Sequence, residues 1–122
     1  MSALTRTGLW IPAHPTWGVN PPTVTALANL DAVTAYECQY LRVGSTVTVS
    51  GQVDADVTTS GSQAGLSITL PIASNFGVAG DCAGTSGNSD VASNSAVIYA
   101  SAVSDYAIME WIGVGAAVNR AF

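Results

Sequence analysis

The clearest pattern in the chain is a strict alternation of two kinds of residue over residues 45–57. One set is small or apolar, namely Val47, Val49, Gly51, Val53, Ala55 and Val57, and the residues between them are polar. A period of two over this length is typical of a β-strand with one buried face and one face in water. The sequence therefore predicts one long strand over residues 45–57.

Similar but shorter runs continue through the rest of the chain after Thr23. Strands are predicted at residues 24–30, 36–43, 66–70, 78–85, 96–101, 106–114 and 116–122. A turn is predicted at residues 31–34, and a long exposed loop at residues 84–94, which are rich in Gly, Ser and Asn. No segment repeats apolar residues at helical spacing. Short strands divided by frequent turns indicate an all-β fold, here an antiparallel two-sheet β-sandwich.

The beginning of the chain departs from this pattern. Residues 1–23 hold four of the five prolines and two of the three tryptophans. Proline excludes a helix and removes strand donors, so residues 1–22 are predicted as an extended Pro-rich arm and residues 23–122 as the β-sandwich domain. The arm either anchors the chain to a neighbour or wraps its own domain, and the low charge of the chain favours anchoring. Its candidate partner-binding residues are Trp10, Ile11, Pro12, Trp17, Pro21 and Pro22.

The composition favours association with other subunits. At 122 residues the chain is one domain, and only 9% of its residues are charged, against about 25% in typical domains. So little charge covers the surface of a small monomer poorly. We therefore expect much of the surface to be neutral and polar, or to be buried by neighbouring chains.

The charges also exclude some classes of partner. Lysine is absent, the cations are Arg6, Arg42 and Arg120, and the net charge is −5. Three scattered arginines cannot neutralise a phosphate backbone, so nucleic acid is excluded as a partner, and so is an anionic membrane surface. The apolar stretches are far shorter than the roughly 20 residues that span a bilayer. We also expect no secretory signal before Pro12.

No group of residues predicts an enzyme, a metal site or a cofactor. Asp54 and Asp56 share one strand face and could contribute to a Ca²⁺ site, but a polar strand face explains them equally well. Glycoside hydrolysis would need the carboxylates to face each other across a cleft. His14 is the single histidine, and with Cys38 and Cys82 it matches no zinc spacing.

The two cysteines leave two alternatives open. Without a visible secretory signal, Cys38 and Cys82 are expected to be reduced and partly buried thiols. A disulfide that joins two sheets is the other possibility, and it would require the two Cα atoms to lie within roughly 7 Å of each other.

Aromatic residues suggest a second class of function. Tyr99 and Tyr106 flank a predicted turn near the 84–94 loop, where they could form a ligand-binding platform for a host surface glycan. Aromatic residues on strands are more often core or interface residues, and Trp111 is predicted to lie in the core.

Four short motifs carry a resemblance to a known family. They are TAYECQYLRVG (residues 34–44), VTVSGQV (47–53), LPIASNF (70–76) and CAGT (82–85). In this order they resemble a β-sandwich domain of tailed-bacteriophage and prophage virion proteins, over about residues 23–112. The resemblance does not extend to the arm before Pro22. Family members also continue through an aromatic C-terminal strand, whereas this chain has the residues NRAF at 119–122.

The resemblance implies a structural part of the virion. Such domains form the heads of tail fibres or decorate capsids, and they are commonly trimeric. The chain is therefore predicted to be a non-enzymatic virion protein, an exterior decoration or small tail-fibre subunit. Its expected partners are other copies in a homotrimer and other virion proteins of the capsid or tail. A carbohydrate-binding module that recognises a host receptor is the alternative.

Overall fold

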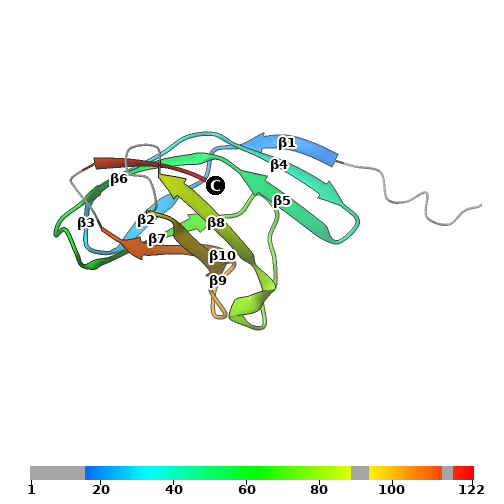
Figure 1. The fold of residues 1–122 in the computed structure, drawn as a ribbon. Helices are drawn as coiled ribbons and strands as arrows, with labels where there is room; N and C mark the ends of the chain where they lie inside the picture. Colours follow the sequence, from blue (N-terminus) through cyan, green and yellow to red (C-terminus); the bar gives the residue numbers. More distant parts are fainter. Residues whose placement is uncertain (1–15, 89–93, 114–116) are drawn as a thin grey trace, which may run out of the picture.

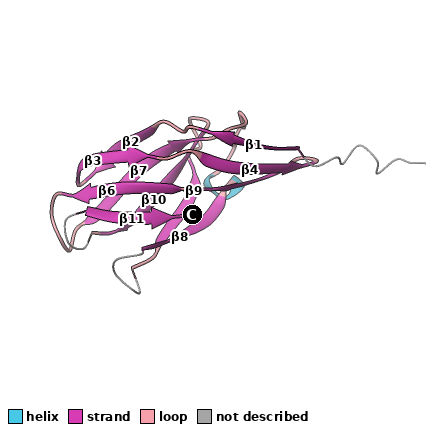
Figure 2. Ribbon diagram, turned by 90° about the horizontal axis from the view of Figure 1, so that it is seen from above, coloured by secondary structure: helices cyan, strands magenta, loops and turns pink. Residues whose placement is uncertain are grey.

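The computed structural model describes residues 16–88, 94–113 and 117–122, and this part of the chain is all-β (Figure 2). Its strands are β1 (Thr16–Asn20), β2 (Val24–Ala28), β3 (Leu30–Ala35), β4 (Cys38–Val43), β5 (Thr46–Ser50), β6 (Gln52–Val57), β7 (Gln63–Thr69), β8 (Ala83–Asn88), β9 (Ala96–Ala100), β10 (Tyr106–Ile112) and β11 (Ala117–Ala121). A short 3-10 helix, η1 (Ala79–Asp81), precedes β8. All strand pairs are antiparallel, and none of the described residues forms a helix that could cross a membrane.

The larger sheet is a nearly closed barrel of eight strands in the order β2-β7-β10-β9-β8-β11-β6-β3 (Figure 1). Its two edge strands, β2 and β3, are consecutive in the chain and meet at Asn29. Asn29 has a positive φ of 56°, a conformation that Asn tolerates better than most residues. The fold predicted from the sequence is therefore confirmed in part. The fold is all-β and antiparallel, but one sheet closes almost completely on itself.

Hydrogen bonds from its side chain fix Asn29 as the corner of the barrel. Asn29 Nδ2 donates to the carbonyl oxygens of Thr59 (2.9 Å) and Ser62 (3.2 Å), and Asn29 Oδ1 accepts from the Thr59 backbone N–H (2.8 Å). These bonds tie the corner to the loop between β6 and β7. The chain can therefore turn from pairing with β7 to pairing with β6 within one residue.

The smaller sheet has three strands in the order β1-β4-β5, and we call it the wing. It continues a long hairpin, because β3 pairs with β6 in the barrel and β4 pairs with β5 beyond it (Figure 1). Between the pairs Ala35–Val53 and Gln39–Ser50, one side of the hairpin has three residues (36–38) and the other has two (51–52). This extra residue is a β-bulge, which bends a hairpin and here turns the wing away from the barrel. The hairpin of the wing turns at Gly44, which has a φ of 61°.

The predicted strand over residues 45–57 is divided at Gly51 into β5 and β6. A Cβ at Gly51 would lie 2.5 Å from Cys38 Sγ and 3.1 Å from Phe122 Cζ, so the bend requires glycine. Gly51 also exchanges two backbone hydrogen bonds with Phe122 (2.8 and 2.9 Å). The alternation itself is confirmed: Val53, Ala55 and Val57 are buried in the barrel, and Val47 and Val49 are half-buried in the wing.

The core fills the interior of the barrel. Its buried residues are Val53, Ala55, Val57, Ala64, Leu66, Ile68, Ala96, Met109 and Trp111. The prediction that Trp111 is a core residue is confirmed, and so is the apolar face of Leu66 and Ile68. The nine core residues come from β6, β7, β9 and β10, so the core joins strands that are far apart in the sequence.

Three local predictions were wrong. Residues 31–34 belong to β3 and not to a turn, and residues 84–88 belong to β8 and not to an exposed loop. The predicted strand over residues 78–85 begins only at Ala83, because Asp81 Oδ2 accepts from the backbone N–H groups of Gly77 (2.7 Å) and Val78 (3.1 Å) and holds a turn there. Pairing with β6, β9 and β11 determines the strands β3 and β8, whose own residues are weak strand formers.

Part of the predicted arm belongs to the wing. Residues 16–20 form β1, which pairs with β4 from Thr16–Arg42 to Asn20–Cys38. The Tyr40 ring packs closely over Gly18, where a Cβ would lie 2.9 Å from it. Pro21 is exposed and Pro22 is buried. The prediction of an extended arm otherwise concerns residues 1–15, including Trp10, Ile11, Pro12 and His14, which lie outside the described residues.

Candidate functional site

The wing presents an apolar face to solvent. Cross-strand partners share a face of a sheet, and the register aligns Trp17 with Leu41 and Thr48. Four apolar side chains on this face are well exposed: Trp17 (77%), Val19 (52%), Leu41 (43%) and Val43 (42%). We call this the outer face of the wing, because the opposite face lies toward the barrel.

Over β1, β4 and β5, which the structure describes, the outer face carries no charged side chain. Its remaining side chains are Gln39, Thr46, Thr48 and Ser50. A shallow hollow of about 310 Å³ lies on it, between Trp17, Leu41 and their neighbours. Apolar surface left in water costs about 25 cal/mol per Å², and a clustered apolar patch on a small protein usually marks an interaction site. This face is therefore suited to contact with an uncharged surface of another macromolecule.

A groove of about 580 Å³ lies on the opposite side of the wing, between β5 and one end of the barrel. Val47 and Val49 of β5 form one wall, and Ile72 and Phe76 of the β7–η1 loop lie among the residues that line the rest. Among the described residues that line it, Asp81 alone has a charged side chain. The groove thus offers a mainly apolar surface beside an edge strand.

Three of the four motifs that carry the family resemblance meet in this groove. Most of its lining residues belong to segments 47–53, 70–76 and 82–85. These segments are distant in the sequence, and only the fold brings them together. Three of the motifs that carry the resemblance therefore lie together around one groove of the folded chain.

The cysteines show no sign of nucleophilic activation. Both are free thiols; Cys38 is buried and Cys82 is half-buried in the wall of the groove. Burial raises the pKa of each thiol, whereas a reactive cysteine needs a lowered pKa. The Cys38 thiol donates to the Tyr36 carbonyl oxygen at 3.7 Å. Both residues act as small packing groups in this structure.

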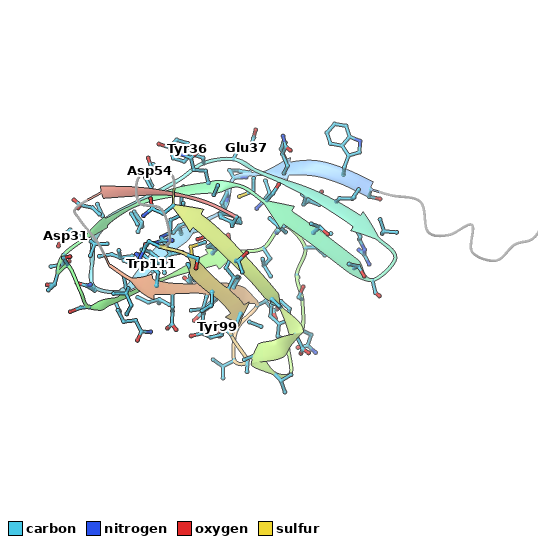
Figure 3. All side chains as sticks on the ribbon, viewed as in Figure 1. Asp31, Tyr36, Glu37, Asp54, Tyr99 and Trp111 are labelled. Carbon is cyan, nitrogen blue, oxygen red and sulfur yellow. The ribbon has the colours of Figure 1, made fainter. Side chains whose placement is uncertain are left out.

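The candidate carboxylates lie on the outside of the barrel (Figure 3). Asp54 Oδ2 accepts a hydrogen bond of 2.6 Å from the Tyr36 hydroxyl, and Asp54 Oδ1 accepts one of 3.2 Å from Gln52 Nε2. The hydrogen bond and the negative charge of Asp54 raise the pKa of Tyr36. Within the described part of the chain, no three His, Cys, Asp or Glu residues are grouped so that they could hold a metal ion.

The tyrosines proposed as a glycan platform lie on strands. Tyr99 is in β9 and Tyr106 is in β10, at diagonal positions on the outer face of the barrel, and both are half-buried. Burial raises the pKa of Tyr99, and a hydrogen bond with Glu110 adds to the effect. The two rings thus share a face but do not belong to an exposed loop.

A buried arginine in the barrel is a feature that the sequence analysis missed. Arg120 of β11 is 0% exposed, and its guanidinium lies over the ring of Trp111. Arg120 Nη1 donates to the Asn94 carbonyl oxygen (2.9 Å), and Nη2 donates to Asn94 Oδ1. Burial lowers the Arg120 pKa to about 10, so the side chain is still charged at neutral pH. Strand alternation in VNRA, which groups Arg120 with Val118, was the one available signal.

No protein-family model, curated protein or solved structure matches the chain. Its function must therefore be argued from these surfaces and from the motifs in its sequence.

Proposed function

We propose that the chain is a non-enzymatic structural protein of a bacteriophage virion, an exterior decoration or small tail-fibre subunit. It attaches to another virion protein through the outer face of the wing. The observation that carries this proposal is the uncharged face on which Trp17, Val19, Leu41 and Val43 are exposed together. The four sequence motifs supply the virion context, as a resemblance.

The chemistry of the face defines its partner. A face without cations cannot neutralise the charge of a nucleic-acid backbone, and an apolar face gains most from apolar, uncharged protein surface. Tryptophan is the residue most enriched among those that dominate binding energy at interfaces. Trp17 is therefore the expected anchor, and Leu41 opposite it completes the contact.

Attachment to a particle also explains how a small binding face can hold the chain on the virion. A virion presents many equivalent sites, and several copies linked in one oligomer bind with far greater avidity than one copy. Each wing then needs only modest affinity. The domain can remain on the particle without the large interface of a permanent complex.

The test is retention on virions that carry the chain. Particles would be purified from phage encoding either the wild-type chain or the variant Trp17→Ser/Leu41→Ser, and its copy number per particle measured by quantitative mass spectrometry. We expect at least about a tenfold loss for the variant, equivalent to about 1.4 kcal/mol. The matched control Val97→Ser, an exposed valine on the barrel, should be retained.

Two results would overturn the proposal. The first is the absence of the wild-type chain from purified particles. The second is retention of Trp17→Ser/Leu41→Ser at the wild-type level. Circular dichroism of each purified variant shows whether a loss reflects binding or misfolding. Antibody labelling of intact particles in electron micrographs then distinguishes capsid from tail.

A further inference from the structure

The groove and the neighbouring edge of β5 form a second interaction surface. β5 pairs with β4 on one side and with no other strand of the described residues. Val47 and Val49, which point toward the barrel, line the groove, and so does Thr48, which lies on the outer face. The groove therefore reaches around the free edge of β5, where backbone N–H and C=O groups lie next to apolar side chains.

Nothing in β5 protects this edge. Proteins usually block an exposed edge strand with charged residues, proline or a bulge. The residues of β5 are TVTVS, without charge or proline, and its pairing with β4 is regular. An open edge beside an apolar groove is the arrangement that accepts an added strand, since the backbone supplies hydrogen bonds and the groove receives alternate side chains.

The segment before β1 contains a short run that suits an added edge strand, in which Pro12 is tolerated where its nitrogen faces away from β5. Residues 1–15, MSALTRTGLWIPAHP, include three consecutive apolar residues, Leu9, Trp10 and Ile11. The segment contains Arg6 and no carboxylate, whereas all eight acidic residues of the chain lie at Asp31 or beyond. It is thus apolar and cationic, while the domain that follows is acidic and the acidic Asp81 is among the described residues that line the groove.

The topology favours exchange of this segment between copies. β1 and β5 are opposite edges of the wing. The chain enters β1 at Thr16, which pairs with Arg42 at the end of the wing far from the barrel. To reach its own β5, the segment would have to reverse at Pro15 and cross the sheet. Fifteen extended residues span up to about 50 Å, which is enough to reach a neighbouring molecule.

We propose that residues 7–13 of one copy add as a strand to the free edge of β5 in a second copy, with Leu9 and Ile11 in its groove. The period of two in a strand places these two side chains on the same face. Repetition of this contact around a ring gives a closed oligomer in which every β5 edge is covered. The inference concerns self-association and does not depend on what the outer face of the wing binds.

The first experiment measures the mass of the full chain by light scattering over a range of concentrations. We expect an oligomer for the wild type and for the control Val97→Ser. We expect monomers for the donor variant Leu9→Ser/Ile11→Ser and for the acceptor variant Val47→Asp. An equimolar mixture of these two variants should form a complex of two chains, because each retains the half of the contact that the other lacks.

The second experiment needs no substitution in the groove. Cys82 lies in the groove wall, so an added strand should shield its thiol from alkylation. We expect Cys82, identified by peptide mass spectrometry, to react at least about tenfold faster in Leu9→Ser/Ile11→Ser than in the wild type. The buried Cys38 in the same sample is the internal reference for an intact fold.

Two outcomes would overturn the proposal. A wild-type oligomer that Leu9→Ser/Ile11→Ser leaves intact would place the subunit contact elsewhere. A wild-type monomer whose Cys82 is shielded by residues 7–13 would place the segment in its own groove. Because virion retention is tested with Trp17→Ser/Leu41→Ser, the two proposals can fail independently.

Discussion

The guanidinium of Arg120 stacks on the indole ring of Trp111 inside the barrel, 4.3 Å from the ring centroid. The same guanidinium donates to the carbonyl oxygen of Asn94 and, through Nη1, to Ser86 Oγ at 3.5 Å. One buried cation therefore links β8, β10, β11 and the segment that precedes β9. A desolvated cation–π contact is worth up to about 2 kcal/mol.

We expect this stacking to be measurable as a coupling energy. In a double-mutant cycle with Arg120→Met and Trp111→Phe, unfolding by urea followed by circular dichroism should give a coupling of about 1–2 kcal/mol. Arg120→Met alone should lower the free energy of unfolding by about 2 kcal/mol, since hydrogen bonds to a charged group are lost. A variant as stable as the wild type would show that the desolvation cost of the cation cancels these contacts.

The corner at Asn29 should be sensitive to both its conformation and its hydrogen bonds. Asn29→Gly keeps the positive φ accessible but loses the bonds to Thr59 and Ser62, and should cost about 1–2 kcal/mol of stability. Asn29→Ala also adds the left-handed strain of about 1 kcal/mol. Urea titration should therefore rank the proteins as wild type, glycine and alanine in falling order. Equal stability of the two variants would contradict the role of the φ angle.

A pair of substitutions tests the close contact between Gly51 and Cys38. Gly51→Ala places a methyl group against the Cys38 sulfur and should destabilise the chain by about 1–3 kcal/mol. Adding Cys38→Ala should recover part of this loss, because it removes the sulfur. Gly87→Ala is the control, since a Cβ at Gly87 meets no atom within 4 Å. Additive effects in thermal unfolding of the double variant would show that the two residues do not interact.

The Tyr36–Asp54 contact predicts a dependence of stability on alkaline pH. The pKa of Tyr36 is raised above its ordinary value of 10.0, so the folded chain holds the phenol proton more tightly than the unfolded chain. The contribution of the contact is complete below pH 10 and is lost as the pH rises through the raised pKa. The difference in stability between wild type and Tyr36→Phe should therefore shrink over this range. Asp54→Asn should lower the Tyr36 pKa, seen as tyrosinate absorbance at lower pH.

Local patterns in the sequence predicted much of the β-structure. The alternation over residues 45–57 predicted the buried face of β6, because a period of two depends only on strand geometry. The closure of the barrel could not be predicted in this way. It depends on the corner at Asn29 and on the register shifts on either side of it, in β2 and β3. All of these act through pairing with distant strands.

The candidate interaction surfaces also depend on contacts between distant residues, so the sequence predicted them only in part. Trp17 was predicted as a partner-binding residue on the basis of its apolar character in a Pro-rich segment. Its place on a sheet face beside Leu41 depends on the pairing of β1 with β4, over more than 20 residues of sequence. The groove was not predicted, although three of its lining segments were recognised as motifs. Arg120 was missed because burial of a cation depends on the Trp111 ring and on Asn94, which only the fold brings near it.

The position of β11 in the barrel has a consequence for folding. β11 lies between β6 and β8, and it joins residues 52–56 to residues 87–88. A growing chain that has reached only β10 therefore has two strands with unpaired facing edges and a barrel that cannot close. Contacts between strands so far apart in the sequence give a high contact order, and a high contact order implies slow folding. Until β11 enters, the facing edges of β6 and β8 stay exposed. We expect this domain to acquire its stability in a single late step, when residues 117–121 enter the gap, and not progressively during synthesis.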